Sequence, residues 1–144
     1  MLTINRLSLA DARVLIEGAT EKSLAMGIPM CMAVCDEAGH LIHFERMDGG
    51  KISSISIAVD KAFTGAVARK GTHVYNQLCQ PGQPTFGIHI TNGGHFSVIG
   101  GGLPITVNGE VVGGVGISSG TAIEDLEVAE AALAYFYSKT GYSA

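Results

Sequence analysis

An Asn-Gly dipeptide at positions 108 and 109 is the feature that most narrows the fold of this chain. Asn and Gly adopt positive φ more readily than other residues, and the type I′ turn of a two-residue β-hairpin requires it. The flanking runs, from 104 to 107 and from 110 to 118, are rich in Val and Ile. The sequence therefore predicts a β-hairpin here, and with it an antiparallel sheet.

A second hairpin is predicted earlier in the chain. The run from 28 to 35 is continuously apolar, which is typical of a strand buried on both faces. The Asp36-Glu37-Ala38-Gly39 segment supplies a turn, and residues 40 to 47 form the returning strand. Residues 96 to 99 are a candidate for a fifth strand.

Helical patterns account for most of the remaining chain. Ser8 is the expected N-cap of a helix that ends at Gly27, and residues 53 to 69 show the clearest helical spacing of apolar residues. Thr72 is expected to cap a short helix through 78. The segment from Thr121 to Glu124 reads as a capping box that opens a helix to about 138. Residues 79 to 103 are predicted to be mostly irregular.

This order of elements predicts an α+β fold with about five antiparallel strands. The N- and C-terminal helices are expected on one face of the sheet and the middle helices on the other. The 144 residues fit a single domain, 1–144.

Composition excludes several classes of function. The net charge is −4, and no basic run is present, so the electrostatic footprint of a nucleic-acid-binding protein is missing. Polar residues interrupt every apolar run, and the N-terminus lacks the layout of a signal peptide, so we expect a cytoplasmic protein outside the membrane. Charged residues make up only 15% of the chain, which favours burial of surface in a homo-oligomer over a lightly charged monomer.

The three cysteines, Cys31, Cys35 and Cys79, are predicted to be reduced and buried. Cys31 and Cys35 lie four residues apart in one predicted strand, too far apart for a disulfide. A catalytic Cys79 is the less favoured alternative.

The histidines give the candidates for binding iron. His89 and His95 flank a Gly-rich turn in the irregular stretch, where an imidazole could ligate haem iron. The alternative is that both are ordinary surface residues. No metal-binding motif of fixed spacing occurs, so no other metal site is predicted.

Charged residues near the middle of the chain are candidates for binding an anion. Arg46 offers a guanidinium fork for a carboxylate or phosphate, and Asp48 could orient it; the alternative is a surface pair of little energetic value. Lys61 lies within the most apolar helix and could anchor an anion, although the sequence slightly favours an exposed side chain.

Glycine- and serine-rich segments add further candidates. Gly101 and Gly102, which precede Pro104, could let the backbone form an anion-binding nest. The glycines of the 111–118 strand would admit a close helix, a flat ligand or another subunit. Ser118 and Ser119 precede a helix N-terminus, which favours anions, although acidic residues already supply negative charge there.

Five motifs in order resemble the GlcG/HbpS family, also called the haem-degrading domain family, to which the C-terminal domain of PduO belongs. They are Asp36-x-x-Gly39-x-Leu41, Arg46-Met47-Asp48, Lys61-Ala62-x-Thr64, Gly101-Gly102-Leu103-Pro104 and the run from Gly109 to Ser118. The resemblance implies a profilin-like α/β/α sandwich with a five-stranded antiparallel sheet, assembly into oligomers, and haem binding in some members. Arg46, Asp48, Lys61, Gly101, Gly102 and Pro104 are its family-pattern positions.

Three hypotheses for the function follow. The first is a small-molecule-binding protein, with haem or another tetrapyrrole as the candidate ligand and no cofactor otherwise. The second is an enzyme or accessory factor that acts on a small oxygenated metabolite in diol or glycolate metabolism. The third is a structural oligomer without a ligand. The sequence shows no nucleophile–base pair and no cofactor fingerprint, which favours the first over an enzyme.

Overall fold

The computed structural model describes all residues, 1–144. The first helix begins where the sequence predicts, after the N-cap Ser8. Helix α1 spans Leu9–Met26, and a capping box between Ser8 and Asp11 satisfies its first N–H groups. Gly27 ends it with a positive φ of 70°. Helix α4 spans Ala122–Thr140 and begins with the predicted capping box of Thr121 and Glu124. Both ends of the chain therefore follow from local sequence signals.

Two hairpins build one antiparallel sheet of four strands. Strands β1 (Cys31–Asp36) and β2 (Leu41–Arg46) form the first hairpin, and β3 (Gly102–Val107) and β4 (Glu110–Ser118) form the second. The order across the sheet is β2-β1-β4-β3, so β1 and β4 lie in the centre. The positive φ values of Asn108 and Gly109, 52° and 80°, confirm the predicted turn.

The prediction of a fifth strand at residues 96 to 99 was wrong. Side chains of neighbouring helices bind the backbone of this segment in place of a strand. Thr64 Oγ1 accepts a bond from Ser97 N at 2.8 Å, and Asn76 Nδ2 donates to Val98 O at 3.2 Å. Phe96 is buried and packs edge-on against another ring, Tyr75. These bonds satisfy the polar groups that a sheet would otherwise pair.

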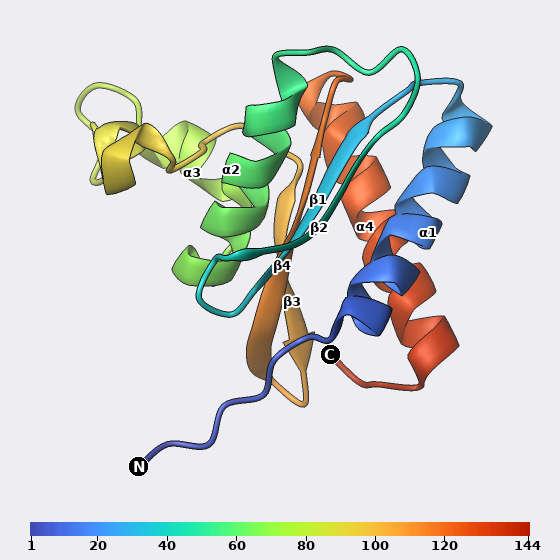
Figure 1. The fold of residues 1–144 in the computed structure, drawn as a ribbon. Helices are drawn as coiled ribbons and strands as arrows, with labels where there is room; N and C mark the ends of the chain where they lie inside the picture. The colour runs from blue at the N-terminus through green and yellow to red at the C-terminus, as the bar shows by residue number, and fades with distance from the viewer.

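Helices cover both faces of the sheet (Figure 1). Helices α1 and α4 lie side by side on one face, as predicted, and enclose the main core with the central strands. Phe136, Leu15 and Ile117 are fully buried there. Helix α2, Ser54–Ala68, covers the opposite face through a layer of small residues, among them Ala58, Ala62 and Ala33. The molecule therefore has a thick apolar layer on one side of the sheet and a thin one on the other.

The glycines of β4 explain the thin layer. A Cβ atom on Gly116 would lie 2.0 Å from the carbonyl oxygen of Ala58, and one on Gly114 would lie 2.2 Å from that of Ala62. Only glycine lets α2 approach this closely. Of the three explanations offered by the sequence, the structure supports a closely packed helix for these two positions.

Helix α3, Thr72–Leu78, starts a segment that projects from the body of the molecule (Figure 1). Its N-cap is Gly71, so the predicted capping role of Thr72 was wrong by one residue. The hydroxyl of Thr72 instead donates to Ile99 O at 2.6 Å. Two short 3-10 turns, η1 (Ile88–Ile90) and η2 (Asn92–Gly94), follow within the predicted irregular stretch. We call residues 79–95 the arm.

The helices show no candidate for a membrane span, since none combines the required length with sufficient hydropathy. That finding agrees with the interrupted apolar runs in the sequence.

Candidate functional site

Several of the predicted site residues meet at one end of the sheet. A pocket of about 210 Å³ opens between the start of α2, the end of β4 and the start of α4. Its polar lining includes Lys51, Ser54, Lys61, Ser118, Ser119 and Asp125. We call it the strand-end pocket.

Lys61 is the most buried charged group of the molecule, so the expectation of an exposed side chain was wrong. Its side chain is 1% exposed and that of Asp125 is 3% exposed. Lys61 Nζ donates to Asp125 Oδ2 at 2.8 Å and to the carbonyl oxygen of Ile117 at 2.9 Å. Paired partners make the burial of both charges tolerable. The pair links α2, β4 and α4 beside the pocket.

Burial acts on both members of this pair. It lowers the pKa of Lys61 and raises the pKa of Asp125, because each charge loses contact with water. The hydrogen bond between them opposes both shifts. A second bond, donated by Gly120 N to Asp125 Oδ1 at 2.9 Å, also favours the carboxylate. Both carboxylate oxygens of Asp125 are therefore occupied by protein donors.

Serine hydroxyls also line the pocket. Ser118 Oγ donates to Ser54 Oγ at 3.0 Å, and Ser119 Oγ accepts a bond from the backbone N–H of Lys51 at 3.0 Å. The backbone of Ser119 has a φ of 115°, which L-residues rarely adopt. The start of α2 lacks a side-chain cap. Ser118 and Ser119, predicted as candidates, therefore do lie at a helix N-terminus, but chiefly at that of α2.

The glycine pair Gly101–Gly102 serves close packing against Lys61. A Cβ on Gly102 would lie 2.3 Å from the carbonyl oxygen of Lys61, and one on Gly101 would lie 3.0 Å from its Nζ. The N–H of Gly102 donates to Thr72 Oγ1 at 3.0 Å. That N–H is therefore not available to the predicted anion-binding nest.

Three other candidates lie apart from the pocket lining. Arg46 pairs across the sheet with Cys31, which in turn pairs with Ser118, yet its exposed side chain forms no ion pair and does not line the pocket. Asp48 is exposed and forms no pair with Arg46, so the predicted surface pair is absent. Pro104 lies on the edge strand β3, where a missing N–H is tolerated.

The cysteines are free and buried, as predicted. Burial raises the pKa of the Cys35 thiol to about 12 and raises the pKa of Cys31 in the same way. A protonated thiol is a poor nucleophile. These two residues therefore serve packing beneath α2.

The two candidate iron ligands lie on the arm and differ in how they are held. His95 Nδ1 lies 2.8 Å from Asp60 Oδ1 on α2, while the side chain of His95 stays 65% exposed. His89 is exposed and makes no hydrogen bond. No group of three or more His, Cys, Asp or Glu side chains is positioned to hold a metal ion. Of the two, only His95 is fixed in orientation.

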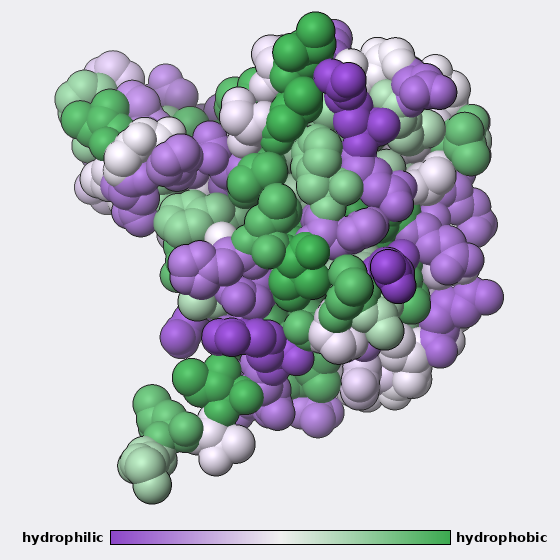
Figure 2. Space-filling view, in the orientation of Figure 1, coloured by the Kyte–Doolittle hydropathy of each residue, from purple (hydrophilic) through white to green (hydrophobic).

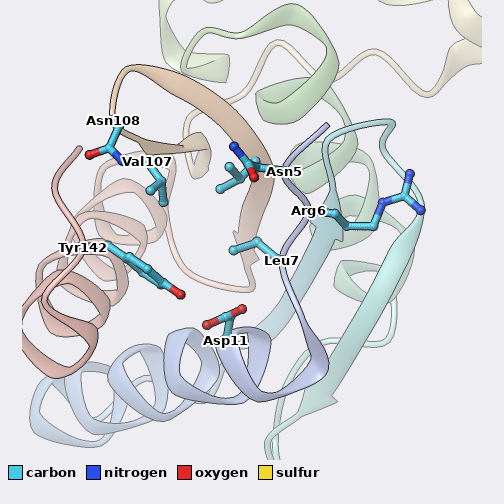
Figure 3. Close-up of a pocket in the computed structure, with 8 residues that line it drawn as sticks. Asn5, Arg6, Leu7, Asp11, Val107, Asn108 and Tyr142 are labelled. Carbon is cyan, nitrogen blue, oxygen red and sulfur yellow. The ribbon is translucent and has the colours of Figure 1, made fainter. Parts of the chain in front are cut away.

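A larger hollow of about 300 Å³ lies between the N-terminal segment, α1, the β3–β4 turn and the C-terminus (Figure 3). Its charged groups have partners elsewhere. Arg6 points out of the hollow in Figure 3 and its Nε donates to Glu37 Oε2 at 2.9 Å, while Asp11 is committed to the cap of α1. The hollow thus lacks a convergent set of free charged groups.

Comparison with known proteins identifies the family. Residues 7–134 match the description "Haem degrading protein HbpS-like". This chain belongs to the HbpS-like family. The resemblance read from the five motifs is thereby confirmed.

Two sequence relatives are informative. An uncharacterised 15.0 kDa protein in the dhaT-dhaS intergenic region of Citrobacter freundii is 36% identical, over 92% of this chain and 94% of the relative. Corrinoid adenosyltransferase PduO of Salmonella typhimurium is 29% identical over 89% of this chain, but the match covers only 38% of PduO. The HbpS-like chain therefore resembles one part of that enzyme.

Solved structures share the fold. Protein ORFY of Klebsiella pneumoniae is 32% identical with a TM-score of 0.92, and the match covers 94% of each chain. A complex of PduOC with haem is 28% identical with a TM-score of 0.86, covering 90% of this chain and 94% of that one. A relative with the same fold thus binds haem.

Sequence reasoning missed three polar members of the strand-end pocket, Lys51, Ser54 and Asp125. Asp125 is the first residue on the buried face of α4, at helical spacing from Val128, Ala129 and Phe136. Lys61 occupies an equivalent place on the buried face of α2. A basic and an acidic residue, each on an apolar helical face, were the signal that could have paired them.

Proposed function

We propose that this HbpS-like chain is a small-molecule-binding protein and that haem is its ligand. The observation that carries the proposal is the haem complex of PduOC, a relative with the same fold. The family description also refers to haem. The structure of the chain offers a residue of its own that fits the role of iron ligand.

His95 meets the chemical requirements of that role. An imidazole that donates Nδ1–H to a carboxylate keeps Nε2 as the lone-pair nitrogen that binds iron. The 2.8 Å contact with Asp60 provides this partner, and the exposed ring remains accessible. Asp60 fixes the ring orientation and makes it a stronger donor. His89 has no such support.

The arm rather than the strand-end pocket would receive a porphyrin. A volume of about 210 Å³ equals that of about seven water molecules, which is far too small for haem. On the arm, Phe86 and Ile90 are 64% and 73% exposed and offer apolar surface. Bound haem would supply an iron centre able to bind small ligands or exchange electrons. The residues of the chain would hold its iron and cover part of its face.

A visible-spectrum titration of the purified protein with haem tests this function. We expect a saturable Soret change in the wild type that His95→Ala abolishes and Asp60→Asn weakens about tenfold or more. His89→Ala is the matched control and should titrate like the wild type. A featureless titration of the wild type, or loss of binding in His89→Ala alone, would refute the assignment.

We also propose that the chain forms a homo-oligomer. Figure 2 shows hydrophobic residues gathered in a band down the middle of one face. Exposed apolar side chains include Leu41 on the edge strand β2 and Ile52, which is 78% exposed. Such surface on a lightly charged chain favours contact between subunits. Light scattering after gel filtration should give a mass of at least twice 14.9 kDa; a monomer would contradict the proposal.

The alternative function, an enzyme or accessory factor acting on a small oxygenated metabolite, is favoured by one observation, the polar strand-end pocket. The third hypothesis, a structural oligomer without a ligand, would remain if neither haem nor a small metabolite bound.

A further inference from the structure

The strand-end pocket offers hydrogen-bond donor protons that have no protein acceptor. Lys61 Nζ carries three protons, of which two are committed, to Asp125 and to Ile117 O. The hydroxyl of Ser119 accepts a bond from Lys51 N, and its own proton has no acceptor. The bond between Ser118 and Ser54 uses one of the two hydroxyl protons. Three protons are therefore available around one small cavity.

The charged acceptor of the site, Asp125, already has protein donors. Gly120 N and Lys61 Nζ occupy the two oxygens of Asp125. The carbonyl oxygen of Ile117 accepts from Lys61. A molecule that matches this lining must therefore bring its own oxygen acceptors, since polar groups removed from water need partners.

The charge of the lining favours an anion. Lys51 and Lys61 are its cations, and Asp125 is its one anion, which gives a net positive lining. The N-terminus of α2, which has no side-chain cap, adds partial positive charge at the same wall. The two effects act in the same direction.

The rest of the lining sets the size and shape of the molecule. Ile57 and Ile99 provide apolar lining beside the polar groups. The volume of about 210 Å³ corresponds to about seven water molecules. A short carbon chain with one charged oxygen group fits both properties.

The backbone of Ser119 gives independent support. Its φ of 115° belongs to a region that favours glycine, and yet a serine with a nearly buried side chain stands there. Strain of this kind persists where the surroundings hold it, and it tends to occur at functional sites. The residue with this strained backbone, Ser119, is also the one whose hydroxyl lines the pocket with an uncommitted proton.

We infer that the strand-end pocket is a second binding site, separate from the arm, for a short-chain carboxylate of about two to four carbons. Its carboxylate accepts bonds from Ser119, Lys61 and the Ser54–Ser118 pair. Its carbon chain lies against Ile57 and Ile99.

Nuclear magnetic resonance titration of the wild-type protein with lactate tests this inference. Saturable shifts should affect the backbone amides of Ser119 and Gly120 and spare that of His95. Lactamide has the same shape without the charge and should bind at least tenfold more weakly. Saturable binding of inorganic phosphate without binding of lactate would overturn the carboxylate assignment, as would shifts confined to other parts of the molecule.

Substitutions then test the role of Ser119. Ser119→Ala removes the hydroxyl and keeps the strained backbone, whereas Ser119→Gly removes both; each should weaken lactate binding at least tenfold. Asn108→Gly, at another positive φ in the β3–β4 turn, is the matched control and should bind like the wild type. Unchanged affinity in Ser119→Gly would overturn the inference. The Soret titration of Ser119→Gly should match that of the wild type, so this result is independent of haem binding.

Discussion

Lys61 on α2 and Asp125 on α4 form a buried ion pair, with Nζ and Oδ2 2.8 Å apart and almost no exposed side-chain surface. The two helices lie on opposite faces of the sheet. The ion pair therefore connects them past the end of the sheet, next to the last residues of β4. This contact holds the walls of the strand-end pocket together.

Removal of one member of the pair should strongly destabilise the protein. Lys61→Met leaves a buried carboxylate without its cation, which should cost about 3–5 kcal/mol of unfolding free energy. In the double variant K61M/D125N the buried charge is gone, and the amide oxygen of the introduced asparagine can still accept the bond from Gly120 N. We expect the double variant to recover about 2 kcal/mol in urea unfolding, because no unpaired charge stays buried. A double variant less stable than either single variant would contradict this account.

The close approach of α2 to β4 should make Gly116 intolerant of any side chain. Gly116→Ala places a methyl group 2.0 Å from the carbonyl oxygen of Ala58 and should cost about 3 kcal/mol or more. Gly82→Ala is the control, because its Cβ would meet nothing within 4 Å while its φ is +84°. Backbone strain alone should cost that variant about 1 kcal/mol. If chemical denaturation gave equal losses of unfolding free energy for the two variants, close packing against α2 would not explain the requirement for glycine at position 116.

Relief of strain at Ser119 should stabilise the fold. Glycine adopts a φ of 115° without a steric penalty, and this gain exceeds its greater entropy in the unfolded chain. Ser119→Gly should therefore raise the unfolding free energy by about 1 kcal/mol, although we expect it to lose carboxylate binding. Differential scanning calorimetry measures the first effect. A lower melting temperature in this variant would indicate that the hydroxyl contributes more to stability than the strain removes.

The capping box of α4 should make the unfolding free energy depend on pH in the acidic range. Bonds from Thr121 lower the pKa of Glu124 in the folded protein below its ordinary value of 4.5. A lowered carboxyl pKa stabilises the folded state above the unfolded pKa, and this stabilisation is lost as the pH falls through the folded pKa. The stability difference between wild type and Glu124→Gln should thus be present at pH 7 and shrink below pH 4.5. Glu130→Gln, at an exposed position of the same helix outside the capping box, is the control variant.

Local signals in the sequence predicted most of the fold. The Asn108-Gly109 turn and the capping boxes of α1 and α4 depend on near neighbours in the chain, and the structure has all three. The prediction of a fifth strand was wrong because long-range hydrogen bonds determine the backbone conformation of that segment. An apolar segment such as 96–99 carries no mark of the Thr64 and Asn76 side chains that bind it.

The site was less predictable for the same reason. Ser118 and Ser119 were recognised from their place before a helix, but Ser54 lies 64 residues away from its partner Ser118. Arg46 has the chemistry of an anion ligand, and yet its side chain stays outside the pocket. Sequence patterns identify residue types suited to a role, whereas packing of distant elements decides which of them meet.

The central claim is that this HbpS-like chain binds haem through His95. The most direct measurement is a crystal structure of the protein grown with haem. We predict iron bonded to His95 Nε2, with Asp60 still in contact with Nδ1 and no porphyrin in the strand-end pocket. Iron bonded to any other side chain, with His95 free, would contradict the claim.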